Sequence, residues 1–443
     1  MTRDMTSGSP IKLIFAFGVP LFIGMMFQQF YHFADTIIVG RILGEGALAA
    51  VGSIGPVNFL ILGFCLGLSN GLVVPIAQSF GAEDYNKLKL YVGNIFWICL
   101  FFGTVLTVTA TVLCRLILEW TGTPADIIDM AFDYLFIIFL GIPAVLAFNT
   151  LAGILRSLGD SRTPLIVMII SAIISIVLAI VFILVFHMGV IGAALATVVA
   201  QTLSAIGFLI IIKRNFYIIH ISKSHLRPNF DCIKKLLGIG IPLGSMFFVM
   251  GIGSVFLQIA INSLGSLAVA AVTAATRVEA LLSSASNSLG AALTTFCGQN
   301  IGAGKIDRIK QGVKICVLIG LIYSLAAFLL TAFFGRYIAL LFIDAGSIEL
   351  LDHTFQFMFI TMAFFWSLAL VHIVRAAVQG MGYGKIVFVG GILEMVGRGA
   401  AGLVFVPLFG FIAVCFAAPA AWVLANIFTI PVFMIILNRA SRR

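Results

Sequence analysis

The chain of 443 residues is 61% hydrophobic and only 10% charged, with a mean hydropathy of +1.18 and a formal net charge of +9. A soluble domain carries about 25% charged residues, so this composition excludes an ordinary water-soluble protein. The seven cysteines are scattered without C-x-x-C or metal-binding spacing, and we expect no disulfide framework.

Twelve apolar segments follow one another along the chain. Each is about 20 residues or longer, the length that crosses about 30 Å of hydrocarbon as a helix. A β-barrel would instead need alternating segments of about 10 residues. We therefore predict an all-α integral membrane protein with twelve transmembrane helices, at 14–40, 47–78, 91–118, 128–156, 165–186, 190–212, 236–262, 267–299, 313–334, 352–378, 386–407 and 410–437.

The loops between these segments differ in positive charge. Of the 26 Lys and Arg residues, 21, including Arg375, fall to the even-numbered loops and the termini, against three (Arg41, Arg115 and Arg336) in the odd-numbered loops. Only Arg277 and Arg398 are assigned to the spans themselves. Because Lys and Arg concentrate on the cytoplasmic side, we predict a multi-pass protein of the cell membrane with both termini in the cytoplasm. The basic excess reflects topology, so no nucleic-acid partner is expected.

The sequence also repeats itself at an offset of 221 residues. "LGEGALAAV" (43–51) falls on "LGSLAVAAV" (264–272), "QSFGA" (78–82) on "QNIGA" (299–303), and "GVIGAALA" (189–196) on "GFIAVCFA" (410–417). The repeat predicts a six-helix lobe at 1–212, a cytoplasmic linker at 213–235 and a second lobe at 236–443. Parallel repeats of this kind hold substrate near their interface and work by alternating access.

Four segments carry a resemblance to a known family: "FADTIIVGRILGEGALAAVG" (33–52), "AQSFGAEDYNKLK" (77–89), "GILRSLGDSRTP" (153–164) and "RVEALLSSASNSLGAALTTFCGQNIGAGK" (277–305). Over nearly its whole length the chain resembles the multidrug and toxic compound extrusion (MATE) family. The resemblance implies two lobes around a central cleft and efflux of drug-like, often cationic, compounds driven by Na⁺ or H⁺. It also implies a cation-coupling role for the aspartate of the pattern Asp-x-x-x-x-Gly-Arg, here Asp35 with Gly40 and Arg41.

Some family positions lack the expected residue. Many relatives carry an Asn and an Asp four residues apart in the fifth helix, where this chain has Ser175 and Ala179. The acidic positions of the NorM-like branch fall at Met250 and near Leu368. A Na⁺ cage is therefore less complete here, and the departures favour H⁺ slightly over Na⁺. If Na⁺ is the coupling ion, Asp35 is its expected ligand; no other metal site and no cofactor are expected.

Asp35 also stands out on physical grounds. A charged side chain at mid-membrane costs about 2.5–3.5 kcal/mol on insertion scales, so such residues usually face a cavity. The alternative is a hydrated carboxylate near the external mouth, or one paired with Arg41. Helical spacing places a polar stripe on the same face as Asp35, which favours the cavity. We predict Asp35 as the cation-coupling residue and a cavity lined by Gln28, Tyr31, His32, Asn58, Arg277 and Glu279.

Two further acidic residues lie within predicted spans. Glu279 is either a second proton or cation-substrate site or a carboxylate neutralised by a neighbouring helix, because Arg277 points to a nearly opposite face. Glu394 and Arg398 are spaced i, i+4 and predict a structural charge pair. With Asp35, these residues give the membrane interior a slight excess of negative charge, which weakly favours cationic cargo.

Three classes of function remain. We favour a secondary active antiporter that exports drug-like, cationic organic compounds in exchange for H⁺ or Na⁺, as a monomer among membrane lipids. The alternative is a flippase for lipid or polysaccharide precursors. An enzyme is least expected, since no catalytic constellation appears and "GQNIGAGK" (298–305) lacks the spacing and Ser/Thr of a phosphate-binding loop.

Overall fold

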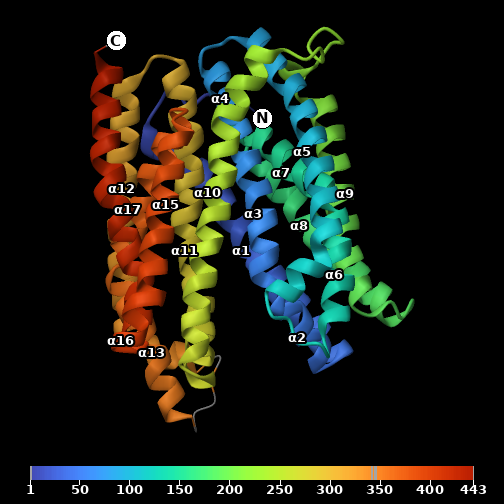
Figure 1. Ribbon diagram of the computed structural model, residues 1–443. Coiled ribbons are helices and arrows are strands. Elements are labelled where there is room, and N and C mark those ends of the chain that lie inside the picture. Colours follow the sequence, from blue (N-terminus) through green and yellow to red (C-terminus); the bar gives the residue numbers. More distant parts are fainter. Residues whose placement is uncertain (1, 341–342, 344–346, 443) are drawn as a thin grey trace. The chain divides into compact units, whose positions relative to one another are not determined.

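The computed structural model describes residues 2–340, 343 and 347–442, without the side chains of His32 and Glu45. Every regular element in these residues is a helix, so the expected all-α fold is confirmed (Figure 1). Within this described part of the chain, ten helices are long and apolar enough to cross a membrane, and the number rises to twelve if each of two bent helix pairs is one span. Each of the twelve predicted segments overlaps one of these spans or bent pairs, but the segment at 47–78 begins too early, because the span starts at Gly55.

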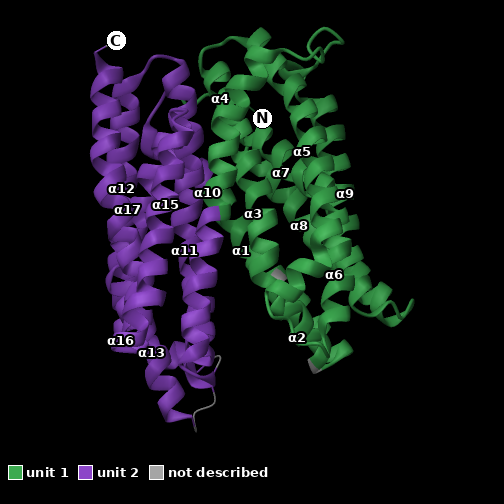
Figure 2. Cartoon of the chain, in the orientation of Figure 1, with its two compact units in different colours: residues 1–5, 19–248 green, residues 6–18, 249–443 purple. Residues whose placement is uncertain are grey.

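Contacts between helices divide the chain into two compact units, shown in Figure 2. Unit 1 comprises residues 1–5 and 19–248, and unit 2 comprises residues 6–18 and 249–443. One boundary, between residues 5 and 6, precedes the first helix, and the other two fall inside long helices, α1 (Pro10–Leu43) and α10 (Phe230–Ser263).

Unit 1 contains most of α1, the first part of α10 and the helices between them. These are α2 (Glu45–Ser53), α3 (Gly55–Leu72), α4 (Val74–Gly81), α5 (Tyr85–Trp120), α6 (Ile128–Leu140), α7 (Ile142–Ser157), α8 (Arg162–Leu184), α9 (Gly189–Asn215) and the short 3₁₀ helix η1 (Tyr217–Ile219). The predicted linker lies against α5, where Trp97 Nε1 donates to the Leu226 carbonyl at 2.7 Å and Asn94 Oδ1 accepts from the Asn229 N–H at 2.7 Å.

Unit 2 continues from the second part of α10. It contains α11 (Ser266–Gly302), α12 (Ile306–Ala339), α13 (Ile348–Ala363), α14 (Phe365–Gly380), α15 (Gly384–Ala400), the π-helical turn η2 (Ala401–Phe405), α16 (Val406–Phe409) and α17 (Phe411–Ser441). Its acidic and basic side chains of interest lie on α11, α14 and α15, with α14 packed against both other helices.

The repeated motifs adopt matching backbone conformations. Gly44 and Gly265 precede α2 and α11 with φ of 90° and 93°, a region that a residue with a Cβ rarely adopts. The "GA" turns match as well: Glu83 and Gly304 have φ of 58° and 71°. The Asp84 and Lys305 N–H groups then bond back to the Ser79 and Asn300 carbonyls at 3.0 and 2.9 Å. The internal repeat is therefore visible in local geometry.

Two spans bend at corresponding places in the repeat. The pair α6 and α7 is bent by 48°, and the pair α13 and α14 by 49°. In unit 1, Gly141 separates the helices and a proline stands in the first turn of α7, where its missing N–H breaks no helical hydrogen bond. In unit 2 the break is at Phe364, whose N–H bonds to the Thr361 carbonyl at 3.2 Å. The bent α7 and α14 bring Phe148 and Arg375 to the two sites described below.

Candidate functional site

Asp35 lies on α1 in unit 1. Among the described residues its carboxylate forms no hydrogen bond or ion pair, and in particular none with Arg41. The phenols of Tyr31 on α1 and Tyr134 on α6 lie close enough to interact with it electrostatically. Asp35 therefore has phenolic neighbours but no fixed positive partner in the part of the chain that the structure describes.

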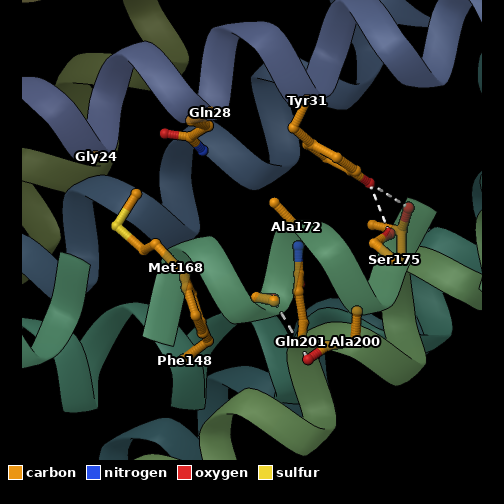
Figure 3. A pocket seen from close by; sticks show the side chains of 11 residues that line it. Gly24, Gln28, Tyr31, Phe148, Met168, Ala172, Ser175, Ala200 and Gln201 are labelled. Carbon is orange, nitrogen blue, oxygen red and sulfur yellow. Dashed lines mark hydrogen bonds between the residues drawn. The ribbon is translucent and has the colours of Figure 1, made fainter. Parts of the chain in front are cut away.

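Tyr31 joins α1 to two other helices. Its hydroxyl oxygen lies 3.0 Å from Ser175 Oγ on α8 and 2.9 Å from Thr197 Oγ1 on α9, so the three hydroxyl groups form one hydrogen-bonded set (Figure 3). Ser175 is the position in the fifth span at which the family resemblance implies an Asn. In this chain its hydroxyl is instead hydrogen-bonded to Tyr31. A net value of about 0.5–1.5 kcal/mol per hydrogen bond makes the set a moderate restraint on α1.

A cavity lies beside this set. Its space for the centres of water molecules is about 70 Å³, enough for a few waters. Gln28 on α1 and Gln201 on α9 both contribute to its wall, and Gln201 Oε1 is a buried acceptor with no hydrogen bond among the described residues. The lining residues are Gly24, Gln28, Tyr31, Phe148, Met168, Ser171, Ala172, Ser175, Thr197, Ala200 and Gln201 (Figure 3).

Only part of the polar face predicted on α1 lines this cavity. Gln28 and Tyr31 line it, whereas Asp35 is not among the lining residues. The side chain of His32 lies outside the described part of the chain. Asn58 lies on α3 away from the cavity wall, and its Oδ1 is buried without a hydrogen bond from any described group. Sequence reasoning missed Thr197 and Gln201, although two polar residues four apart in an apolar span are a usable signal.

In unit 2 the buried carboxylate of Glu394 on α15 has two arginine partners. Arg375 on α14 donates from Nη2 to Glu394 Oε1, and Arg398 Nη2 lies 3.8 Å from Glu394 Oε2. Glu394 is 2% exposed, and the arginine side chains are 12% and 17% exposed. Glu394 and Arg398 therefore lie together as an i, i+4 pair, but Arg375 makes the closer contact.

The assignment of Arg375 to a loop is wrong. Its backbone is helical within α14, which continues to Gly380, and its guanidinium is largely buried. The charge is tolerated there because Glu394 neutralises it on the neighbouring helix, a compensation that charge counting along one segment cannot detect. Arg375 Nη1 also lies 3.9 Å from Met250 Sδ.

Glu279 on α11 lies within electrostatic range of one member of this group. It interacts electrostatically with Arg398, yet among the described residues no ion pair or hydrogen bond joins the two. Arg398 instead donates from Nη1 to Ser254 Oγ on α10 at 3.1 Å. Arg277 is exposed on α11.

The placement of Arg375 changes the charge balance of the spans. The three acidic residues weighed in the sequence analysis, Asp35, Glu279 and Glu394, are now set against three arginines, Arg277, Arg375 and Arg398. The slight negative excess inferred from the sequence therefore disappears, and with it the weak preference for cationic cargo that rested on this excess.

One family model, several relatives of similar sequence and several solved structures match this chain. A family model described as MatE matches residues 20–181 and 242–398, two stretches whose spacing agrees with the internal repeat. Two proteins of Bacillus subtilis (strain 168) are similar to this chain. The probable multidrug resistance protein YoeA is 27% identical and the probable multidrug resistance protein YpnP is 29% identical. Each match covers 77% of this chain and 76% of the relative. A solved MOP-superfamily transporter from Pyrococcus furiosus Vc1, for which reverse polarity of the binding pocket suggests a different function, has a TM-score of 0.90 at 24% identity over 99% of this chain and 98% of that chain.

Proposed function

Since the chain belongs to the MatE family, whose members are membrane transporters and not enzymes, we propose that it exports small organic molecules in exchange for H⁺. Multi-pass insertion and membership of a multidrug efflux family are properties of the chain, whereas the coupling ion and the cargo belong to the proposal. The observation that carries it is the Asp35 carboxylate on α1, which has no ion pair among the described residues.

A carboxyl group in this position suits ion coupling. A carboxyl group tends to be neutral where water is excluded and charged where water or a cation reaches it. An acidic side chain without a fixed positive partner can therefore change state when its access to water changes. Such a change drives conformational exchange only if the two conformations bind the ion with different affinity.

Two positions on α8, where many relatives of the resembled family carry an Asn and an Asp, favour H⁺ over Na⁺ as the coupling ion. A bound metal cation needs several oxygen ligands around it, whereas a proton needs one basic atom. Ala179 supplies no side-chain oxygen, and the Ser175 hydroxyl is already hydrogen-bonded to Tyr31 at 3.0 Å. Asp35 would take up and release the proton, and the hydrogen bonds of Tyr31 would hold α1 in register with α8 and α9.

The cargo is a small organic compound. The balanced charge of the embedded residues gives no reason to restrict it to cations. A flippase for lipid or polysaccharide precursors is less supported, because the two Bacillus subtilis relatives carry multidrug resistance descriptions. Cytoplasmic termini, a monomeric state and a two-lobe division at 213–235 complete the proposal.

The test is dye uptake into everted membrane vesicles that contain the wild-type chain, because an exporter moves its cargo into the lumen of such vesicles. An imposed pH gradient in Na⁺-free buffer should drive accumulation of ethidium or a rhodamine dye, and an imposed Na⁺ gradient at equal pH should not. Accumulation driven by Na⁺ alone would overturn the choice of ion. Accumulation under neither gradient, with the protein present in the vesicles, would overturn gradient-coupled export.

A further inference from the structure

We propose that the connecting segment 213–230, which leads from the end of α9 to the start of α10 in unit 1, is a docking surface for the headgroups of anionic phospholipids. Three observations carry the inference: the segment is fixed against unit 1, it lies where the exposed apolar face of α5 begins, and it exposes basic and aromatic side chains. The inference goes beyond the proposed export function, because it concerns neither the coupling ion nor the cargo.

The first step is that the connecting segment is held in place. It crosses the end of unit 1 at which α9 ends and α5 begins (Figure 1). Phe216 is buried in the apolar core of unit 1, and Trp97 on α5 donates to the Leu226 carbonyl at 2.7 Å. A Cβ on Gly93 of α5 would lie 2.1 Å from the His225 carbonyl oxygen, so the two backbones are in close contact. The outward-facing side chains of the segment therefore occupy defined positions.

The second step is the depth of the segment in the membrane. At the far end of α5, Arg115 forms an exposed ion pair with Asp129, so the hydrocarbon must end before Arg115. A helix crosses the hydrocarbon with about 20 residues, which places the other boundary at about residue 95. Most of the large apolar side chains that α5 exposes lie between these limits: Phe96, Trp97, Leu100, Phe101, Val105, Val108, Val112 and Leu113. Trp97 and the segment bonded to it thus lie where hydrocarbon meets headgroups.

The third step is the chemistry that the segment exposes. Phe230 is 85% exposed and Tyr217 is 74% exposed. Aromatic side chains at this level of a membrane protein are stabilised at the headgroup interface. The segment contains no acidic residue, and its four basic residues are all exposed: Lys213, Arg214, Lys223 and Arg227. Basic side chains close to a membrane surface attract anionic headgroups, so the surface fits a lipid with net negative charge.

Helix α9 shows the same boundary. Its exposed apolar side chains continue to Ile210, and the exposed Lys213 and Arg214 follow within about one turn. Long basic side chains in such a place reach polar headgroups while their stems stay in apolar surroundings. A soluble acidic protein would also meet the positive charge, but the surface continues directly into exposed apolar helix faces. This continuity favours lipid as the occupant.

The test measures lipid selectivity at a tryptophan beside the segment. A variant with Trp120→Phe and Trp366→Phe keeps Trp97 as the reporter, together with Trp422, which is 2% exposed and gives a constant background. The purified full-length protein is reconstituted into vesicles of phosphatidylglycerol and phosphatidylcholine, with bromine on the acyl chains of one lipid at a time. Quenching of the fluorescence then gives the ratio of the two binding constants. Phosphatidylglycerol should bind beside Trp97 about fivefold more strongly, the attraction of one basic side chain to an anionic surface.

Control variants locate the selectivity. Trp97→Phe with Trp366→Phe keeps Trp120, which is exposed at the far end of α5, and there the two lipids should bind equally. In the Trp97 reporter, Lys223→Gln with Arg227→Gln should lower the ratio to about twofold. Lys12→Gln with Lys385→Gln removes the same charge from exposed positions of unit 2 and should leave the ratio unchanged.

Equal binding of the two lipids beside Trp97 would overturn the proposal, and so would a preference that survives Lys223→Gln with Arg227→Gln. A reporter that neither brominated lipid quenches would overturn the depth assigned to the segment and the proposal with it. Both leaflets of the vesicles have the same composition, and neither dye nor gradient is present, so the result depends on neither the orientation of the chain nor the proposed coupling. Normal gradient-driven export without lipid selectivity would overturn the docking surface alone.

Discussion

Replacing Arg375 with Met should destabilise unit 2 far more than replacing Arg398 with Gln. Arg375 contributes the closer guanidinium to Glu394, whose side chain is only 2% exposed, and a Met side chain would fit beside Met250. Removing one partner of a buried ion pair costs about 3–5 kcal/mol, because the other charge is left unpaired.

The Arg398 contact that remains after the substitution determines how much stability is lost within this range of about 3–5 kcal/mol. After Arg375→Met, Glu394 keeps Arg398 at 3.8 Å, which is longer than a charge-assisted hydrogen bond. We therefore expect a loss at the lower end, about 3 kcal/mol, for Arg375→Met. Arg398→Gln leaves the Arg375 contact intact and should cost about 1 kcal/mol, the value of one ordinary hydrogen bond. The double variant Arg375→Met with Glu394→Leu also removes the buried carboxylate and should recover part of the loss, while Arg398 keeps its hydrogen bond to Ser254.

The assay is unfolding of the purified protein in mixed micelles with increasing sodium dodecyl sulfate, followed by circular dichroism. Monodisperse yield on size-exclusion chromatography reports the same order in a second way. If Arg398→Gln is as damaging as Arg375→Met, or if the double variant is no better than Arg375→Met, then Arg375 is not the principal partner of Glu394.

Three further results are expected. Single cysteines at Ser224 and Ser347, in a cysteine-free background, should react with an impermeant maleimide from opposite sides of the membrane, and labelling of both from outside would contradict cytoplasmic termini. Tyr31→Phe removes hydroxyl contacts of 3.0 and 2.9 Å and should lower stability by about 1–2 kcal/mol in the same unfolding assay, whereas an unchanged midpoint would mean that the hydroxyl set does not restrain α1. Gly67→Ala places a Cβ 2.4 Å from the Leu243 carbonyl oxygen on α10 and should lower the free energy of unfolding by about 1–3 kcal/mol. Gly207→Ala, where a Cβ meets open space, should leave the stability unchanged. Equal effects of the two substitutions would argue against close packing of α3 on α10.

Much of the fold is readable from the sequence because its signals are local. Apolar segments of the right length predicted the spans. The repeat of "LGEGALAAV" in "LGSLAVAAV" predicted two related halves, and the structure adds that Gly44 and Gly265 in these segments share one backbone conformation. A glycine with positive φ followed by a helix is fixed by neighbouring residues, so a single sequence reveals it.

The candidate sites were less readable because their contacts join distant helices. The stripe of Gln28 and Tyr31 on α1 follows from helical spacing, but Ser175 and Thr197 reach Tyr31 only through the packing of α8 and α9. Arg375 shows the same limit. Its partner is 19 residues away on another helix, so the count of loop charges assigned to a loop a charge that packing keeps inside the span.

The most direct test of the account compares Asp35→Asn with Asp35→Glu in everted vesicles at matched expression. Asn keeps the size and hydrogen-bonding capacity of the side chain but does not ionise, whereas Glu retains the titrating group. We predict that Asp35→Asn inserts normally and still binds dye but accumulates none under an imposed pH gradient, while Asp35→Glu keeps measurable gradient-driven accumulation. Accumulation by Asp35→Asn at the wild-type rate would contradict the assignment of Asp35 as the coupling residue.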